Sequence, residues 1–177
     1  MSCVVLIGFM GVGKSVVGSA LAGKLSWPFL DTDEIVEEQA GIPISTLFEE
    51  RGEPAFRKLE SEAIAIALTE DPSVISLGGG APTQASNWDL LRKIQAFVVW
   101  LDAPVEIIVD RIGTAGSRPL LAGLDQESRN AKIVDMLAVR RSSYEMANLR
   151  FFTDNTASPM EWAARLASDL EHLKATA

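Results

Sequence analysis

The sequence predicts one α/β domain in which a mostly parallel sheet is covered by helices on both faces. Two observations support this prediction. Short apolar runs alternate along the chain with segments of helical periodicity, which is the pattern of βαβ units. The length of 177 residues, with 47% hydrophobic and 23% charged residues, is that of one globular domain with a sizeable core.

The apolar runs predict the strands of this sheet. CVVLI and FVVWLD are continuous apolar stretches, as expected for strands that are buried on both faces. PFLD, SVISL and LRFF are shorter and complete the set. The predicted strands span residues 3–7, 28–31, 73–77, 97–102 and 149–152.

Segments with apolar positions at a spacing of 3.6 residues predict the helices. Gly41 is a candidate αL cap, Ser45 a candidate N-cap, Gly52 a terminator, and Pro54 suits the first turn of the next helix. The segment 113–125, GTAGSRPLLAGLD, is irregular. The predicted helices span residues 14–25, 33–41, 45–52, 54–68, 105–112, 126–147 and 158–173.

The composition indicates which kinds of partner and which cellular compartment to expect. The net charge of −8 argues against nucleic acid as a partner, because a phosphate backbone needs a basic footprint. An anionic ligand would require several of the 16 Lys and Arg side chains at one site. No stretch has the length and apolarity of a membrane span, and no signal peptide is apparent. The single cysteine, Cys3, suits a reducing compartment and is expected to pack in the first strand, so we expect a cytoplasmic protein.

A glycine-rich stretch, IGFMGVGKS, stands between the first strand and the first helix. Gly8, Gly13, Lys14 and Ser15 fit G-x-x-x-x-G-K-[ST], in which main-chain N–H groups and a helix N-terminus form an anion nest. Lys14 would reach the β- and γ-phosphates of a nucleotide, and the Ser15 hydroxyl would bind Mg²⁺. The alternative is a turn with an exposed lysine. The predicted phosphate-binding residues are Gly11, Val12, Gly13, Lys14, Ser15 and Val16.

Val16 departs from many such loops, in which a second hydroxyl residue is common. Whether the α-phosphate is contacted therefore stays open. The phosphate-binding motif alone does not separate kinases, GTPases and motor ATPases. The absence of an N-K-x-D stretch weighs against a GTP switch.

Three aspartates at or just after strand ends are candidates for binding the metal ion or the acceptor hydroxyl. Asp31 and Asp33 flank the end of the second strand, although Asp31 with Glu34 also resembles a capping box. Asp102 ends the apolar run FVVWLD, so the pattern alone favours Asp102 for the metal. Its alternative role is to cap the helix that begins near Pro104.

Five further stretches identify a family. LDTDE, FRKLE, SLGGG, SRPLL and RRSSY occur in the order and approximate spacing seen in shikimate kinases. With the phosphate-binding loop they extend from Gly8 to Tyr144, and the chain resembles this family closely. The resemblance implies a P-loop NTPase of the nucleoside-monophosphate-kinase type, with a five-stranded parallel sheet of order 2-3-1-4-5 flanked by helices. It also implies transfer of the ATP γ-phosphoryl group to the 3-hydroxyl of shikimate, with ATP and Mg²⁺ as cofactors.

The resemblance further implies one kinase domain over residues 1–177. Substrate-binding helices are expected at about 33–62 and a lid at about 112–124. We expect a monomer whose partner is shikimate rather than a nucleic acid or a membrane. A gluconate or nucleotide kinase, and a non-catalytic nucleotide-binding module, are the alternatives.

The resemblance also assigns roles to residues at the nucleotide and the reacting groups. Asp31 lies near Mg²⁺ through water, with Ser15 as the other metal residue, and Asp33 hydrogen-bonds the hydroxyl that is phosphorylated. The catalytic residues are then Asp33, Lys14 and Arg118. Arg118 lies in the expected lid, where a mobile surface loop is the alternative. Arg111 stacks on adenine and Pro159 lies on its other side.

At the acceptor, the resemblance implies that Arg57 and Arg140 bind the shikimate carboxylate. Glu60 would hold Arg57 in place. Arg140 is preferred to Arg141 because it stands four residues before Tyr144, as in the R-x-x-x-Y of the family. The other residues implied at the acceptor are Phe48, Phe56, Gly78, Gly79 and Gly80. Five cations, Lys14, Arg57, Arg111, Arg118 and Arg140, would thus gather at one site.

Overall fold

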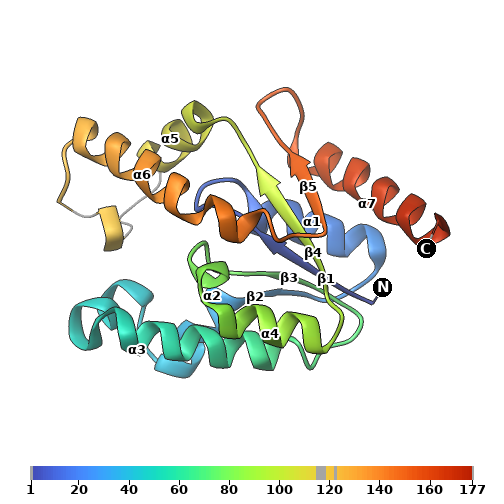
Figure 1. The fold of residues 1–177 in the computed structure, drawn as a ribbon, viewed down its shortest axis with the longest axis horizontal. Coiled ribbons are helices and arrows are strands. Elements are labelled where there is room, and N and C mark those ends of the chain that lie inside the picture. The colour runs from blue at the N-terminus through green and yellow to red at the C-terminus, as the bar shows by residue number, and fades with distance from the viewer. Residues whose placement is uncertain (1, 115–118, 122, 177) are drawn as a thin grey trace.

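The computed structural model describes residues 2–114, 119–121 and 123–176, which form a five-stranded parallel sheet (Figure 1). The strands lie in the order β2-β3-β1-β4-β5, which confirms the predicted order. In register, Leu6 of β1 pairs with Ser76 of β3 and with Val99 of β4. The strands are β1 (Cys3–Ile7), β2 (Phe29–Asp31), β3 (Ser73–Ser76), β4 (Phe97–Asp102) and β5 (Leu149–Phe152).

Seven α-helices and two 3₁₀ turns of the described residues surround this sheet. Helix α1 packs with α7, while α3 packs with both α2 and α4. Figure 1 shows α3 and α4 together in the lower part of the view, with α5 and α6 at the upper left. The helices are α1 (Lys14–Leu25), α2 (Thr32–Ala40), α3 (Ile44–Ala67), α4 (Ala85–Lys93), α5 (Val105–Thr114), α6 (Gln126–Tyr144) and α7 (Pro159–Thr176), with η1 (Ala81–Thr83) and η2 (Pro119–Leu121).

Helix α4 was not predicted from the sequence. It has nine residues, most of them polar, and its N-cap residue Gln84 makes no side-chain capping bond. Only Trp88 and Leu91 bury apolar side chains from it. The helix therefore gives little periodic signal, and its contacts with α3 stabilise it.

Helix α3 joins the two helices that were predicted at 45–52 and 54–68. Gly52 has φ 75° and ψ 173°, so the expected break is present as a kink within α3. The prediction of Ser45 as N-cap was wrong. Pro43 has that position, and the helix starts at Ile44, because the fixed φ of proline suits a helix entry.

The apolar strands form the centre of the core. Val4 to Ile7 are fully buried, and Cys3 is 6% exposed in β1, as expected. In the described residues, no helix has both the length and the apolarity to cross a bilayer. Because the strands are parallel, their carboxyl ends meet at one edge, where the residues after β1, β2 and β3 come together.

Candidate active site

The loop after β1 has backbone angles that suit the phosphate-binding nest that the motif predicts. Gly11 and Gly13 have φ of 78° and 99°, in the left-handed region that favours glycine, so the loop curls tightly into α1. Lys14 is 9% exposed, and its Nζ donates to Gly8 O at 3.0 Å and Phe9 O at 3.2 Å. The ammonium therefore lies across the mouth of the loop.

Asp31 connects this loop to the end of β2. Its Oδ2 accepts a hydrogen bond of 2.6 Å from Ser15 Oγ, and its Oδ1 accepts one of 3.1 Å from Asp33 N. Asp31 is thus the N-cap of α2 and a neighbour of the loop serine at the same time. The two oxygens suit a hard cation such as Mg²⁺, which prefers oxygen ligands.

Arg57 on α3 is held by two carboxylates. Its Nη1 donates to Glu60 Oε2 at 2.7 Å, and its Nη2 donates to Glu53 Oε1 at 2.9 Å. Its guanidinium carbon lies 5.2 Å from the centroid of the Phe56 ring. Burial lowers the pKa of Arg57, but Glu60 and Glu53 outweigh burial and raise that pKa above its usual value.

Glu60 is buried, with 1% of its surface exposed. Its Oε2 also accepts from Gln84 Nε2 at 3.3 Å, whereas its Oε1 has no hydrogen-bond partner among the described residues. Burial raises the pKa of Glu60, although the charge of Arg57 opposes this shift. The Asp33 carboxylate raises the pKa of Glu60 further, so the carboxyl groups of Asp33 and Glu60 lie near each other.

Gly78 and Gly80 are glycines because side chains approach their backbone closely. A Cβ on Gly78 would lie 2.5 Å from Glu60 Oε1 and 2.8 Å from Asp33 Oδ1. A Cβ on Gly80 would lie 2.5 Å from both Nη1 and Nη2 of Arg57. The glycine run therefore admits a cation and two carboxylates to one small space.

Tyr144 and the arginine before it reach the same run from α6. Tyr144 Oη donates to Gly79 O at 2.6 Å, and burial raises the pKa of this tyrosine to about 12. Arg140 is 8% exposed, with its guanidinium carbon 5.4 Å from the centroid of the Phe9 ring. Arg141 instead pairs with Glu145 at 2.9 Å on the exposed surface. Of the two adjacent arginines, Arg140 is the buried one.

Two cavities lie at this edge of the sheet. The first, here named the loop cavity, measures about 440 Å³ and is lined by residues 10–17 together with Arg111 and Pro159. The second, named the arginine cavity, measures about 360 Å³ and is lined by Arg57 and Arg140. The other predicted acceptor residues also line the arginine cavity, namely Phe48, Phe56, Glu60, Gly78, Gly79 and Gly80.

The two cavities have a common wall. Met10, Ser15, Asp31, Asp33 and Gly79 line both of them. Within the described residues, four of the five predicted cations therefore surround two adjoining spaces. The fifth, Arg118, lies outside the described residues, as do residues 115–117 and 122 of the expected lid.

Asp102 has a different environment. Its Oδ2 accepts from Arg150 Nε at 2.9 Å, and its Oδ1 accepts from Ala103 N at 3.0 Å. It is not among the residues that line the two cavities. The geometry thus brings Asp31, and not Asp102, next to the loop serine.

Arg111 bridges the phosphate-binding loop and the segment before α7. Its Nη1 donates to Val12 O at 3.2 Å, and its Nη2 donates to Asp154 O at 3.2 Å and to Asn155 Oδ1 at 2.9 Å. Sequence reasoning did not single out several residues that line the cavities, among them Met10, Thr153, Ala157 and Trp162. Met10 could have been found from its place inside the motif, but Thr153, Ala157 and Trp162 gave no signal.

A phosphate-binding loop at the carboxyl end of a parallel sheet, with a cationic cavity beside it, defines a P-loop kinase of small molecules. Residues 10–171 match the family model for shikimate kinase. The chain belongs to the shikimate kinase family.

Relatives of known identity agree with this assignment. The shikimate kinase of Moorella thermoacetica is 44% identical over 151 residues, which cover 85% of this chain and 84% of that protein. The shikimate kinase of Chlorobium chlorochromatii is 37% identical over 177 residues, covering 97% and 88%. The solved structure of the Acinetobacter baumannii shikimate kinase in complex with shikimate has a TM-score of 0.90 and 32% identity, covering 98% and 95%. The family resemblance is confirmed, and a gluconate or nucleotide kinase is not supported.

Proposed function

We propose that the protein transfers the γ-phosphoryl group of ATP to the 3-hydroxyl of shikimate, giving shikimate 3-phosphate and ADP. The observation that carries this proposal is the common wall of the two cavities, which includes Ser15, Asp31 and Asp33. Phosphoryl transfer depends mainly on positioning and on charge stabilisation, so donor and acceptor sites must adjoin.

The loop cavity suits the nucleotide. The main-chain N–H groups of the glycine-rich loop form an anion nest, and Lys14 would turn from its two carbonyl partners toward the β- and γ-phosphates. Arg111 and Pro159, on the same cavity, would flank the adenine. Although the chain is acidic overall, Lys14 and Arg111 thus supply local positive charge for the nucleotide phosphates.

The metal site is also part of this proposal. Ser15 Oγ and Asp31 are the oxygens that would hold Mg²⁺, Asp31 through water. The described residues contain no cluster of three or more His, Cys, Asp or Glu that could hold a metal. This fits Mg²⁺, which keeps several waters and is shared with substrate phosphates. When bound, the ion neutralises charge that develops on the phosphate oxygens.

The arginine cavity suits the acid. Arg57 and Arg140 would bind the shikimate carboxylate, since guanidinium groups are planar and always charged. Glu60 keeps Arg57 oriented through the 2.7 Å contact. The other lining residues, Phe48, Phe56 and Gly78 to Gly80, would contact the ring and its hydroxyls.

Asp33 would orient the 3-hydroxyl and accept its proton. In the transfer, the 3-oxygen forms a bond to the γ-phosphorus, the bond from that phosphorus to the β,γ-bridging oxygen breaks, and the proton goes to the Asp33 carboxylate. Arg118 would add positive charge from the lid at about 112–124. A non-catalytic nucleotide binder would not need an acidic side chain on the acceptor side.

The remaining expectations stand as part of the proposal. One kinase domain spans residues 1–177, with substrate-binding helices at about 33–62. The protein acts as a monomer in the cytoplasm, and neither nucleic acid nor membrane is a partner. The net charge of −8 supports the exclusion of nucleic acid.

A coupled assay of ADP release with shikimate or gluconate as acceptor tests the proposal. We expect turnover with shikimate, and we expect Asp33→Asn to lower kcat about 100-fold or more. Asp102→Asn is the matched control, because Asp102 lies outside both cavities, and it should keep its turnover. Turnover with gluconate but not with shikimate would overturn the proposal.

A further inference from the structure

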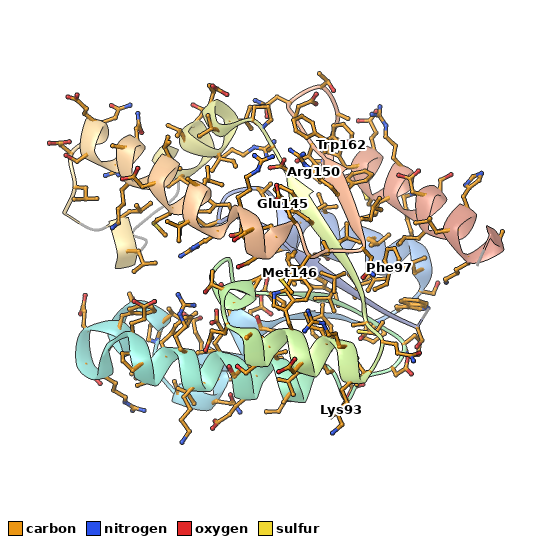
Figure 2. The ribbon with its side chains drawn as sticks, viewed as in Figure 1. Lys93, Phe97, Glu145, Met146, Arg150 and Trp162 are labelled. Atoms are coloured by element: carbon orange, nitrogen blue, oxygen red, sulfur yellow. The ribbon has the colours of Figure 1, made fainter. Side chains whose placement is uncertain are left out.

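Trp162 lines the loop cavity together with the phosphate-binding loop. It lies in the first turn of α7 and is 9% exposed. Figure 2 shows it at the start of α7, beside β5. Thr153, Ala157 and Pro159 lie on the same cavity and come from the same part of the chain. Since Pro159 is the residue that would flank the adenine, Trp162 lies in the part of the cavity wall that the proposed function gives to the nucleoside.

The indole Nε1 of Trp162 has no hydrogen-bond acceptor within the part of the chain that the structure describes. Its ring packs edge-on against Phe151, at 5.9 Å between centroids, and Arg165 lies over it at 4.6 Å. A guanidinium has no acceptor, and a phenyl ring offers this N–H at most a weak contact with its face. In contrast, Trp88 Nε1, also buried, donates to Pro82 O at 2.8 Å.

A buried donor without an acceptor costs free energy, so each instance calls for an explanation. Among the described residues, two buried side-chain atoms lack a partner: Glu60 Oε1 and Trp162 Nε1. Glu60 lines the arginine cavity and Trp162 lines the loop cavity. Each cavity is thus lined by one residue that has a buried polar atom without a partner among the described residues.

We propose that Trp162 is a nucleotide-binding residue whose Nε1–H donates a hydrogen bond to a ring nitrogen or ribose oxygen of the nucleotide. The proposal rests on the proposed function in taking a nucleotide as the ligand. The phosphates go to the main-chain N–H groups of the glycine-rich loop. Arg111 contacts both Val12 O at that loop and Asp154 O in the segment before α7, and Trp162 lines the cavity together with residues of that segment. Because Nε1 is covered by protein, the indole turns slightly as the nucleotide enters.

Trp162→Phe tests this role, because it removes the donor and keeps an aromatic ring against Phe151. We expect the Kd for ADP, measured by calorimetry, to rise about threefold to tenfold, the range of one net hydrogen bond. The Kd for inorganic tripolyphosphate, which has no base or ribose, should not change. Trp27→Phe is the matched control, since Trp27 packs near Lys174 and is outside both cavities, and it should change neither value.

Two results would overturn the role of Trp162: an unchanged Kd for ADP, or an equal loss for ADP and tripolyphosphate, which would show a general disturbance of the cavity. If the wild-type protein bound no ADP, the proposed function would fail instead. If Trp162→Phe does not fold, NMR of the wild-type protein tests the proposal through the indole N–H signals of its four tryptophans. ADP should move one of them strongly and tripolyphosphate should not; no shift with ADP would overturn the proposal.

Discussion

Replacing Gly80 with alanine tests whether the glycine run shapes the arginine cavity. Gly80 has φ −93° and ψ −17°, which any residue adopts, so the change adds volume without backbone strain. The new Cβ would lie 2.5 Å from Nη1 and Nη2 of Arg57. That is about 1 Å closer than an ordinary contact. The guanidinium must therefore move.

The displacement has a cost that can be worked out. Arg57 is anchored by the 2.7 Å contact with the buried Glu60, so it cannot move and still meet a carboxylate in the same geometry. Losing one charge-assisted hydrogen bond costs about 1.5–3 kcal/mol. We therefore expect the KM for shikimate to rise about 10- to 150-fold in Gly80→Ala. The KM for ATP should stay the same, because Gly80 does not line the loop cavity.

The assay is ADP release with shikimate varied at saturating ATP. Gly23→Ala in α1 is the matched control, because a Cβ there meets nothing within 4 Å. It should leave both KM values unchanged and stabilise the fold by about 0.5–1 kcal/mol, as expected for a glycine within a helix. A folded Gly80→Ala protein with an unchanged KM for shikimate would refute the reasoning.

Three further predictions concern single side chains. Lys14→Met should lower kcat at least about 100-fold in the same assay, with a native circular dichroism spectrum; retained turnover would contradict the role of Lys14. Arg140→Ala should raise the KM for shikimate about 30-fold or more. Arg141→Ala removes a side chain that is 57% exposed and should not raise this KM. Equal effects of the two substitutions would contradict the assignment of Arg140, and not Arg141, to the carboxylate. Burial raises the pKa of Tyr144 from 10.0 to about 12, so the folded chain retains a proton that the unfolded chain releases, and stability falls as the pH rises from 10.0 to about 12. Relative to Tyr144→Phe, the wild type should lose up to about 3 kcal/mol of unfolding free energy over this range in urea unfolding, and parallel pH profiles of the two proteins would contradict this prediction.

Most of the fold was predictable because its signals are local. The predicted strands at 3–7, 97–102 and 149–152 coincide with β1, β4 and β5, since continuous apolar runs are typical of parallel strands buried on both faces. Helix α4 was not predicted, because contacts with α3, and not its own sequence, stabilise it. Long-range packing of this kind leaves no periodic pattern to read.

The candidate site was less predictable, because similar residues differ only in their distant neighbours. Asp31 and Asp102 both end strands, so the pattern treats them alike. Arg150, which is 48 positions from Asp102, pairs with it, whereas Ser15 lies against Asp31. Sequence motifs thus supply candidates, and the order of the strands determines which candidates meet.

The unpaired atoms in the two cavity walls extend this argument. A sequence indicates which residues carry donors and acceptors, but the packing of distant elements decides which of them remain unpaired. Glu60 Oε1 lies unpaired beside Gly78, whose N–H donates instead to Thr32 Oγ1 at 3.1 Å. Stability alone would favour completing such groups within the protein. Their occurrence in the walls of both cavities, and at no other buried side chain that the structure describes, indicates that these walls are shaped for bound molecules.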